Sequence, residues 1–414
     1  MTSSFLKLRD FTADSYLLFS TRMARLFAYG FLSVVLVLYL SSMGLNEGQI
    51  GLLLTLTLIG DTVISFWITT NADRIGRKRM LIAGAALMLF AGLLFAVTQN
   101  FVFLLIAGTI GVISPSGNEV GPFLALEQAA LSQIVPDSRR TQIFAWYNLV
   151  GSFATALGAL CGGGLAQLLQ GAGVSPLNSY RAIVVGYALI GVVLGLMFTR
   201  LTASVEVPRA LLKTGNPLGL HRSRKVVLKL SALFTLDAFA GGLVLQSFVA
   251  YWFHVRYGVE PALLGAIFFG ANILAGFSAL SAVSIAKRIG LINTMFFTHV
   301  PSNILLILVP LMPTLPLAII MLLLRFSISQ MDVPTRQSYT MAVVDPDERS
   351  AAAGVTGIAR TTGSSLAPTI AGQLLGNATL LNVPFILCGA LKIIYDFALL
   401  YNFRKIKPPE ESTK

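Results

Sequence analysis

The sequence predicts an all-α membrane protein with twelve transmembrane helices in two pseudo-symmetric six-helix bundles. Three observations predict this fold class: the composition, the regular succession of apolar segments and an internal repeat. Of the 414 residues, 55% are hydrophobic and only 12% are charged. Soluble globular chains carry about 25% charged residues. A chain this apolar is expected to lie in a lipid bilayer.

Apolar segments of spanning length follow one another along the chain, since a helix needs about 20 apolar residues to cross a bilayer. We place the twelve spans at residues 16–42, 49–70, 80–98, 102–134, 141–168, 182–199, 230–253, 262–286, 293–311, 315–343, 351–376 and 383–402. Pro115 and Pro122 lie inside the fourth span and are expected to bend or break its helix. An even number of spans places both termini on one side of the membrane.

Basic residues concentrate in the loops on one side of these spans. Most of the 30 Lys and Arg residues lie on the side of the short turn 73–79. Because loops rich in Lys and Arg stay in the cytoplasm, this side and both termini are expected to be cytoplasmic. The net charge of +12 therefore reports orientation, and no nucleic-acid partner is expected. The basic segment 200–229 is interpreted as a cytoplasmic linker between an N-terminal bundle, 1–199, and a C-terminal bundle with a short tail, 230–414.

The two halves of the chain repeat one another. At an offset of 212 residues, Gly30 aligns with Gly242. After a two-residue insertion, the run Ala72–Gly76 aligns with Ala286–Gly290, so the basic turn after the second span has a weaker counterpart after the eighth. A register sustained over many residues indicates two copies of one six-helix unit in parallel orientation.

The turn between the second and third spans carries a motif, Asp73-Arg74-Ile75-Gly76-Arg77-Lys78-Arg79. It resembles the loop between helices 2 and 3 of the major facilitator superfamily, although Thr69 stands where that family has a leading glycine. With the repeat, the resemblance covers nearly the whole chain and implies a transporter that binds its substrate near the middle of the membrane, between two bundles. It assigns a gating role to Asp73, Arg74, Gly76, Arg77, Lys78 and Arg79. By this resemblance Asp73 interacts with the start of helix 11 in the outward-open state.

Ionisable residues inside the spans are the candidates for function. At the bilayer centre each costs at least ~2.5–3.5 kcal/mol, so it needs a partner or a wet cavity. The candidates for the substrate and proton pathway are Arg22, Arg25, Tyr29, Asp61, Glu119, Glu127, Asp237, Arg325, Asp332, Arg336 and Arg360. We place equal numbers of cations and acids in the spans, so structural ion pairs that only fix helix packing are the alternative for each. Lys392 and Asp396, four residues apart, are interpreted as such a pair, and His299 as a hydrogen-bonded packing residue.

The first span places Arg22, Arg25 and Tyr29 on one helical face. The resemblance implies that helices 1, 4, 7 and 10 line the central cavity, so this face is expected to look inward. In the repeat, Arg25 aligns with Asp237. One hypothesis is a gate pair between the halves. The alternative is a local partner for each residue, such as Asp61 for Arg25.

The tenth span has a polar stripe, Arg325, Ser329, Asp332 and Arg336, at steps of four, three and four residues on one helical face. Asp332 and Arg336 can satisfy each other, which leaves Arg325 as a candidate for binding a substrate anion. In the fourth span, Glu119 is the leading candidate for a proton carrier, because burial raises the pKa of a carboxyl group. A purely structural Glu119 is equally open.

These features predict a secondary active transporter that is coupled to protons and exports small organic or amphipathic compounds. Transport of an organic anion, by uptake or export, is the alternative that the arginines favour. A membrane receptor or sensor with a transporter fold is an alternative of another class. The motifs typical of proton-driven members and of antiporters are incomplete, since the fourth span lacks an arginine and Gly158–Gly163 lacks a proline.

Other classes find no support in the sequence. No phosphate-binding loop occurs, so ATP is not the expected driver. The histidines are scattered and form no metal-ligand or nucleophile cluster, so neither an enzyme, a metal site nor a cofactor is expected. A monomer in the bacterial inner (plasma) membrane is expected, with a small-molecule substrate, protons and the lipid bilayer as its partners.

Overall fold

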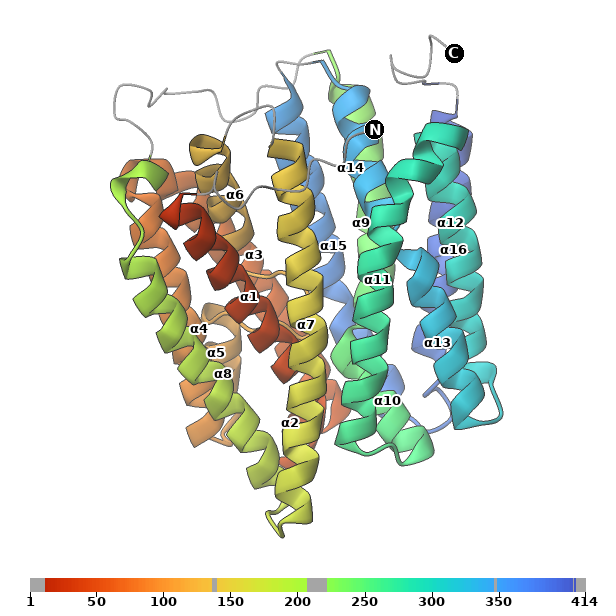
Figure 1. The fold of residues 1–414 in the computed structure, drawn as a ribbon. Coiled ribbons are helices and arrows are strands. Elements are labelled where there is room, and N and C mark those ends of the chain that lie inside the picture. Colours follow the sequence, from red (N-terminus) through yellow and green to blue (C-terminus); the bar gives the residue numbers. More distant parts are fainter. Residues whose placement is uncertain (1–11, 136–139, 207–221, 346–347, 405, 407–414) are drawn as a thin grey trace, which may run out of the picture.

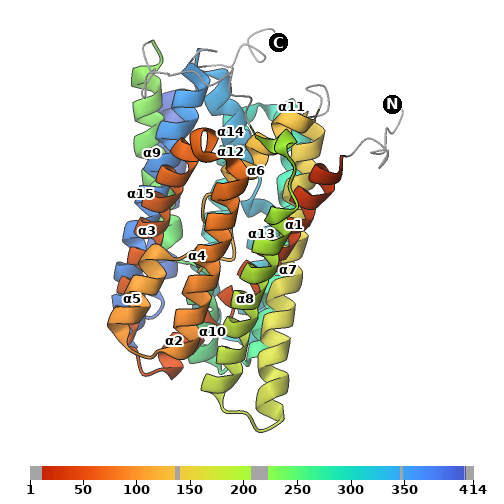
Figure 2. The same ribbon diagram turned by 90° about the vertical axis from the view of Figure 1, so that its left-hand side faces the viewer.

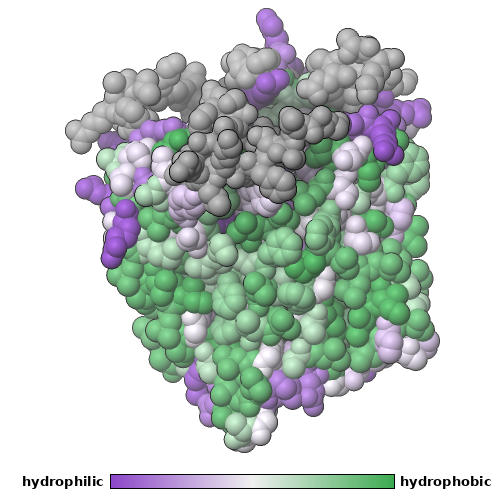
Figure 3. Space-filling view, viewed as in Figure 1, coloured by the Kyte–Doolittle hydropathy of each residue, from purple (hydrophilic) through white to green (hydrophobic). Residues whose placement is uncertain are grey.

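The computed structural model describes residues 12–135, 140–206, 222–345, 348–404 and 406. The described chain is helical, and its helices stand side by side as a bundle in which the first helix begins and the last helix ends on the same side (Figures 1 and 2). Figure 3 shows apolar residues over the middle of the surface and hydrophilic residues at its two ends. A lipid-facing belt of this kind is what an integral membrane protein requires.

The N-terminal half holds the first six predicted spans. Its helices are α1 (Ala13–Ser33), α2 (Leu36–Ser42), α3 (Glu47–Ile75), α4 (Arg77–Val97), α5 (Phe101–Ile110), α6 (Phe123–Ile134), α7 (Arg140–Gly171) and α8 (Pro176–Thr199). The break predicted in the fourth span is confirmed, because no helix covers residues 111–122 and Pro122 stands directly before α6. Two glycines in this segment, Gly117 and Gly121, have positive φ values of 68° and 80°, a conformation that other residues rarely adopt.

The C-terminal half holds the other six. After a short 3-10 helix, η3 (Ala203–Val205), it contains α9 (Arg224–Gly242), α10 (Gln246–Tyr257), α11 (Pro261–Ile289), α12 (Leu291–Leu308), η5 (Val309–Leu311), α13 (Leu315–Ser329), α14 (Asp332–Ala342), α15 (Arg349–Leu375) and α16 (Val383–Phe403). The helix α9 begins six residues before the predicted start of the C-terminal bundle at residue 230, so residues 224–229 are helical and not part of a loop.

Nine spans in the described chain are long and apolar enough to cross a membrane, or ten if α1 and α2, bent by 43°, count as one. The two remaining predicted spans are the broken pair α5–α6 and α15, which carries Arg360 and many hydroxyl side chains. Because α5–α6 is irregular and α15 is polar, these two elements need protein or water around them within the membrane.

The start of the predicted linker is bound to the N-terminal half. Glu206 accepts hydrogen bonds from the backbone nitrogens of Arg77 (2.7 Å) and Lys78 (3.1 Å), at the first turn of α4. Asp14 in α1 accepts a hydrogen bond from the backbone nitrogen of Thr202 (3.1 Å). A carboxylate at a helix N-terminus is favourable, so this segment stabilises the α3–α4 turn.

The two halves contact each other at the end of the molecule that lies away from the α3–α4 turn. There α3 crosses α15 where Gly51 meets Gly372, and α7 crosses α11 where Gly163 meets Gly265. A Cβ on Gly163 would lie 2.1 Å from the carbonyl oxygen of Pro261, so no larger residue fits without a shift. The backbones touch at both crossings.

Polar bonds join the halves at the same end. The Gln246 side chain donates to Ser33 Oγ (2.9 Å), and the Tyr251 hydroxyl donates to Glu47 Oε1 (2.5 Å). Toward the turn, by contrast, α15 presents Gly354 and Gly357 to open space, with no atom within 4 Å of an added Cβ. The two halves are thus in backbone and side-chain contact at the α2–α10 end.

Candidate functional site

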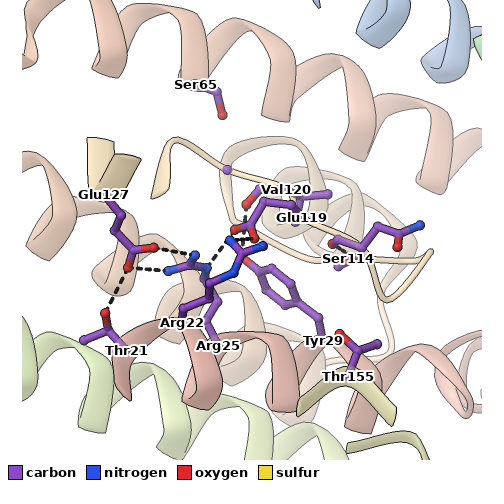
Figure 4. A network of polar contacts seen from close by, with 12 residues as sticks. Thr21, Arg22, Arg25, Tyr29, Ser65, Ser114, Glu119, Val120, Glu127 and Thr155 are labelled. Carbon is purple, nitrogen blue, oxygen red and sulfur yellow. Dashed lines mark hydrogen bonds and ion pairs between the residues drawn. The ribbon is translucent and has the colours of Figure 1, made fainter. Parts of the chain in front are cut away.

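The broken fourth span places two carboxylates against the arginines of α1. Arg25 donates from Nε to Glu119 Oε1 (2.9 Å) and from both terminal nitrogens to Glu127 (2.7 Å each). The Arg25 and Glu127 side chains are fully buried. Figure 4 shows both carboxylates, one from the irregular segment and one from α6, pointing toward the two arginines. We call Arg22, Arg25, Glu119 and Glu127 the N-terminal charge cluster.

Each charge in this cluster has several partners. Arg22 donates to Glu119 Oε2 (2.9 Å), to the carbonyl oxygen of Tyr147 (2.8 Å) and to Asn148 Oδ1 (3.2 Å). Glu127 also accepts from Thr21 (2.9 Å) and from the hydroxyl of Tyr147. Two cations face two anions, so the cluster is balanced. Its most accessible member is Glu119, with 15% of its side chain exposed.

Two further predicted residues support the irregular segment. Asp61 Oδ1 accepts from the backbone nitrogen of Gly121 (2.7 Å) and from Ser65 Oγ (3.3 Å). The Tyr29 hydroxyl donates to the carbonyl oxygen of Val120 (3.1 Å). Backbone groups freed by a helix break must find partners inside a membrane, and Asp61 and Tyr29 supply them.

In the other half, one carboxylate is shared among three cations. Asp237 accepts from Lys392 Nζ (2.5 Å) on one oxygen, and from Arg336 (3.3 Å) and Arg360 (3.1 Å) on the other. Asp332 accepts from Arg336 (2.7 Å), so the predicted pair of neighbours on α14 is confirmed. We call Asp237, Asp332, Arg336, Arg360 and Lys392 the C-terminal charge cluster.

A histidine and a second carboxylate adjoin this cluster. His299 Nδ1 lies 2.7 Å from Asp396 Oδ1, and its Nε2 lies 4.0 Å from Asp237 Oδ1. Asn303 donates to the other Asp396 oxygen (3.1 Å). His299 is hydrogen-bonded as predicted, but its partners connect it to the charge cluster.

Exposure separates the members of the C-terminal charge cluster. The Arg360 side chain is 34% exposed, whereas that of Arg336 is 7% exposed, that of Lys392 11% and that of Asp237 4%. Arg360 is therefore the most exposed cation of the C-terminal charge cluster. Arg325 is half-buried on α13 beside the ring of Phe326, and its Nε has no hydrogen-bond partner in the described part of the chain.

Three predicted pairings are wrong. Arg25 does not pair with Asp237, because Arg25 is saturated by the carboxylates of the fourth span and Asp237 by cations of its own half. Asp61, the predicted local partner of Arg25, holds the irregular segment instead. Lys392 binds Asp237, while Asp396 binds His299, so these two neighbours on α16 do not pair with each other. Spacing along a single helix could not reveal partners that lie on other helices.

The gating motif occupies the α3–α4 turn, as predicted. Arg77 is buried and donates to Asp73 Oδ1 (2.8 Å) and to Gln133 Oε1 (2.9 Å), while Lys78 donates to the carbonyl oxygen of Leu201 (2.8 Å). Gly76 has a φ of 118°, which the turn requires of a glycine. The remaining members of the motif, Arg74 and Arg79, are exposed. The expected contact between Asp73 and helix 11 concerns another conformation and stays a prediction.

Sequence reasoning missed the roles of Tyr147 and Asn303. The hydroxyl and the carbonyl oxygen of Tyr147 both bind the N-terminal charge cluster, and no spacing in the sequence indicated these contacts. Asn303 shares a helical face with His299, and this spacing was the available signal for its contact with Asp396. In the described ranges, no group of three His, Cys, Asp or Glu residues could hold a metal ion.

Comparison with known proteins gives relatives for the chain. An uncharacterized membrane protein of Saccharomyces cerevisiae, YJR124C, is 31% identical over 430 aligned residues that cover 96% of each chain. A Na(+), Li(+), K(+)/H(+) antiporter of Planococcus maritimus is 29% identical over 49% of this chain and 48% of its own. The quinolone resistance protein NorA of Staphylococcus aureus is 27% identical over 34% of each chain.

Solved structures share the fold. A D-xylose–proton symporter superposes with a TM-score of 0.74 at 14% identity, over 97% of this chain and 99% of its own. A bacterial homologue of the human lysosomal transporter Spinster, in an inward-facing and occupied conformation, superposes with a TM-score of 0.71 at 16% identity, over 94% and 96%. The family model described as Major Facilitator Superfamily matches residues 18–368. This chain therefore belongs to the major facilitator superfamily of membrane transporters.

Proposed function

We propose that this protein is a proton-coupled secondary transporter of small organic compounds that works by alternating access. The observation that carries the proposal is the pair of charge clusters, one in each half, whose members lie inside the spans. Each cluster has one member that is partly exposed between helices, Glu119 in one half and Arg360 in the other. Buried charge is costly in a bilayer and marks a solute or proton pathway.

Glu119 is our candidate for the proton carrier of the N-terminal half. Its two oxygens bridge Arg22 and Arg25, and it is the more exposed carboxylate of the cluster. Proton binding to Glu119 would leave the arginines with Glu127 alone, which changes the charge balance from neutral to positive. A group whose charge affects the packing of the helices around it can bias the equilibrium between two conformations.

Export of amphipathic compounds remains the first substrate class. The partial similarity to NorA and to a cation/proton antiporter supports it, and both similarities cover half of this chain or less. The contacts between the halves at the α2–α10 end support a state that is open toward the α3–α4 turn. If that turn is cytoplasmic, as the distribution of Lys and Arg predicts, this state is inward-facing.

An organic anion is the second candidate, and Arg360 favours it. A guanidinium that is one-third exposed inside a spanning helix offers free N–H donors to a carboxylate. Arg325 adds a second cation without a carboxylate partner in the described part of the chain. Neither feature would help a lipophilic cation.

Proteoliposomes test the proposal and separate the two substrate classes. The purified protein would be given an imposed pH gradient and a panel of organic anions and lipophilic cations, with protein-free liposomes as the control. Gradient-dependent movement of a panel member is the expected result. Binding of ligands without movement of any of them would instead indicate a sensor that has kept the transporter fold.

The cellular setting belongs to the proposal as well. Location in a bacterial inner membrane, cytoplasmic termini and a monomeric state are predictions from the sequence. The full-length relative from yeast makes a eukaryotic membrane an equal candidate. Accessibility of a terminal tag in intact cells would fix the side on which the termini lie.

A further inference from the structure

We infer that His299 is the proton-binding group of the C-terminal half and that its protonation transfers Arg360 from Asp237 to an anionic group of the substrate. The inference rests on the organic-anion form of the proposed function and names the residues that would couple the anion to the proton. It stands on the position of His299 between two carboxylates and on the unequal exposure of the cations around Asp237.

The geometry leaves one nitrogen of His299 available for a proton. Nδ1 lies 2.7 Å from the Asp396 carboxylate, so in the neutral ring Nδ1 carries the hydrogen and donates it. Nε2 then bears the lone pair, and the nearest carboxylate oxygen on its side is Asp237 Oδ1 at 4.0 Å. A proton that binds Nε2 turns this nitrogen into a charged donor directed at Asp237. Histidine is the side chain that ordinarily changes its charge between about pH 5 and 8.

Charge counting shows what this proton would do. With His299 neutral, Arg336, Arg360 and Lys392 balance Asp237, Asp332 and Asp396. Protonation of His299 adds one positive charge that no carboxylate of the group balances. The cluster then has an excess cation, and an anion from outside restores neutrality.

Arg360 is the cation that is free to leave. Arg336 keeps Asp332 at 2.7 Å whatever happens at Asp237, and Lys392 is nearly buried. Arg360 binds Asp237 through one nitrogen at 3.1 Å, and its side chain is 34% exposed. It can therefore exchange Asp237 for a solute without becoming an unpaired buried charge, which would cost several kcal/mol.

Buried polar atoms without partners lie on the same helix as His299. On α12, Ser302 Oγ and Asn303 Oδ1 are buried and have no hydrogen-bond partner within the described residues. The same holds for Ser329 Oγ on α13, which packs against α12. Buried polar atoms are nearly always satisfied, by ordered water where the protein offers no partner. The helix that carries His299 is therefore polar on its buried side.

Charged and titratable groups from four other helices surround the charge cluster that His299 adjoins. Asp237 comes from α9, Asp332 and Arg336 from α14, Arg360 from α15, and Lys392, Tyr395 and Asp396 from α16. On its own helix α12, Asn303 holds Asp396 in place through a 3.1 Å hydrogen bond. His299 is the member of this set whose second ring nitrogen stays available for a proton, so it is the group that we expect to take up the coupling proton.

The experiment compares wild-type protein, His299→Gln and His254→Gln in proteoliposomes, with p-aminohippurate and carboxyfluorescein as anionic probes. Glutamine can still donate to Asp396 but cannot bind a proton. We expect wild-type protein to accumulate a probe along the pH gradient, and His299→Gln to lose at least tenfold of that accumulation while it keeps probe exchange without a gradient. His254, on α10, hydrogen-bonds the backbone carbonyl of Val259 just after that helix and lies outside the cluster, so His254→Gln should behave as wild type.

A second readout follows the proton directly. In protein labelled with ¹⁵N-histidine, the His299 signal is assigned by its absence from His299→Gln, and we expect addition of the probe at fixed pH to increase the protonated fraction. The Arg360→Gln variant should abolish this response. Gradient-driven accumulation that survives in His299→Gln, or a His299 signal unchanged by a transported probe, would overturn the inference alone. No movement of either anion by the wild type would overturn both the organic-anion candidate and the inference.

Discussion

The two halves of this molecule stabilise buried charges within the membrane in different ways. In the N-terminal charge cluster two arginines pair with two glutamates, and Arg25, whose side chain is fully buried, binds both carboxylates. In the C-terminal charge cluster a single aspartate is shared among three cations, one of which is one-third exposed. The first arrangement is saturated, whereas the second contains bonds that can be exchanged.

Backbone irregularity explains part of this difference. In the N-terminal half, residues 111–122 leave the helix and bring Glu119 beside the arginines of α1, with Asp61 and Tyr29 holding the freed backbone. In the C-terminal half, α13 and α14 are separated only by residues 330 and 331, so Arg336 and Asp332 stay on one helical turn and bind each other.

The largest effect is expected from Glu127→Gln, which tests whether the N-terminal charge cluster is a structural anchor. Arg25 would lose its bidentate partner in a fully buried position. Removing one partner of a buried ion pair costs about 3–5 kcal/mol. Thermal unfolding in detergent should show a large loss of stability, whereas Glu260→Gln, at an exposed position, should change little. Equal stability of both variants would show that the N-terminal charge cluster is not a structural anchor.

Asp237→Asn should lower the stability less than Glu127→Gln does, but it should reduce transport more. Arg336 retains Asp332 and Arg360 reaches solvent, so mainly Lys392 loses its partner. The expected loss of stability is about 1.5–3 kcal/mol, the range for hydrogen bonds to charged groups. Asp237→Asn combined with Lys392→Met should recover most of it, but proton-driven transport should remain absent. A double variant as unstable as the single one would contradict a shared, exchangeable aspartate.

A matched pair of variants can test whether the glycine crossing of α7 and α11 keeps the two halves in contact at the α2–α10 end. Gly163→Ala places a methyl group against the backbone of α11, whereas Gly164→Ala meets no atom within 4 Å. Overpacking costs about 1–3 kcal/mol, which shifts a two-state equilibrium by about 5- to 150-fold. A cysteine at Ser33 should then react faster with a reagent from the α2–α10 end in Gly163→Ala only. Equal rates in the two variants would show that this crossing does not hold the closed state.

No loss of stability is expected from Arg325→Met, which sharpens the distinction between structural and functional cations. Arg325 Nε lacks a hydrogen-bond partner in the described chain, so a methionine of similar length should leave the free energy of unfolding unchanged or raise it by about 1–3 kcal/mol. If Arg325 binds a substrate anion, affinity for that anion should fall at least tenfold in the same variant. A strongly destabilised Arg325→Met would instead reveal a structural role.

Much of the fold could be predicted because the bilayer imposes a length and a composition on every span. The outer ends of the predicted spans coincide with those of the observed helices to within several residues, and Pro115 and Pro122 marked the longest break. The short interruptions after Ser33, Gly242 and Ser329 were not predicted. The pair Asp332–Arg336 was also predictable, since residues four apart share a helical face. The partners of Arg25, Asp237 and Lys392 were not, because they come from helices up to 155 positions away along the chain.

The sequence by itself determined that the chain crosses a membrane, that its halves are copies and that ionisable residues lie within its spans, because hydropathy, repetition and charge are properties of the residues alone. Only the tertiary structure decided which charges neutralise one another. Where water is excluded, each buried cation pairs with the carboxylate that the packing of other helices brings within reach. This packing surrounds Arg25 with carboxylates in the N-terminal charge cluster and leaves Arg360 partly exposed in the C-terminal charge cluster.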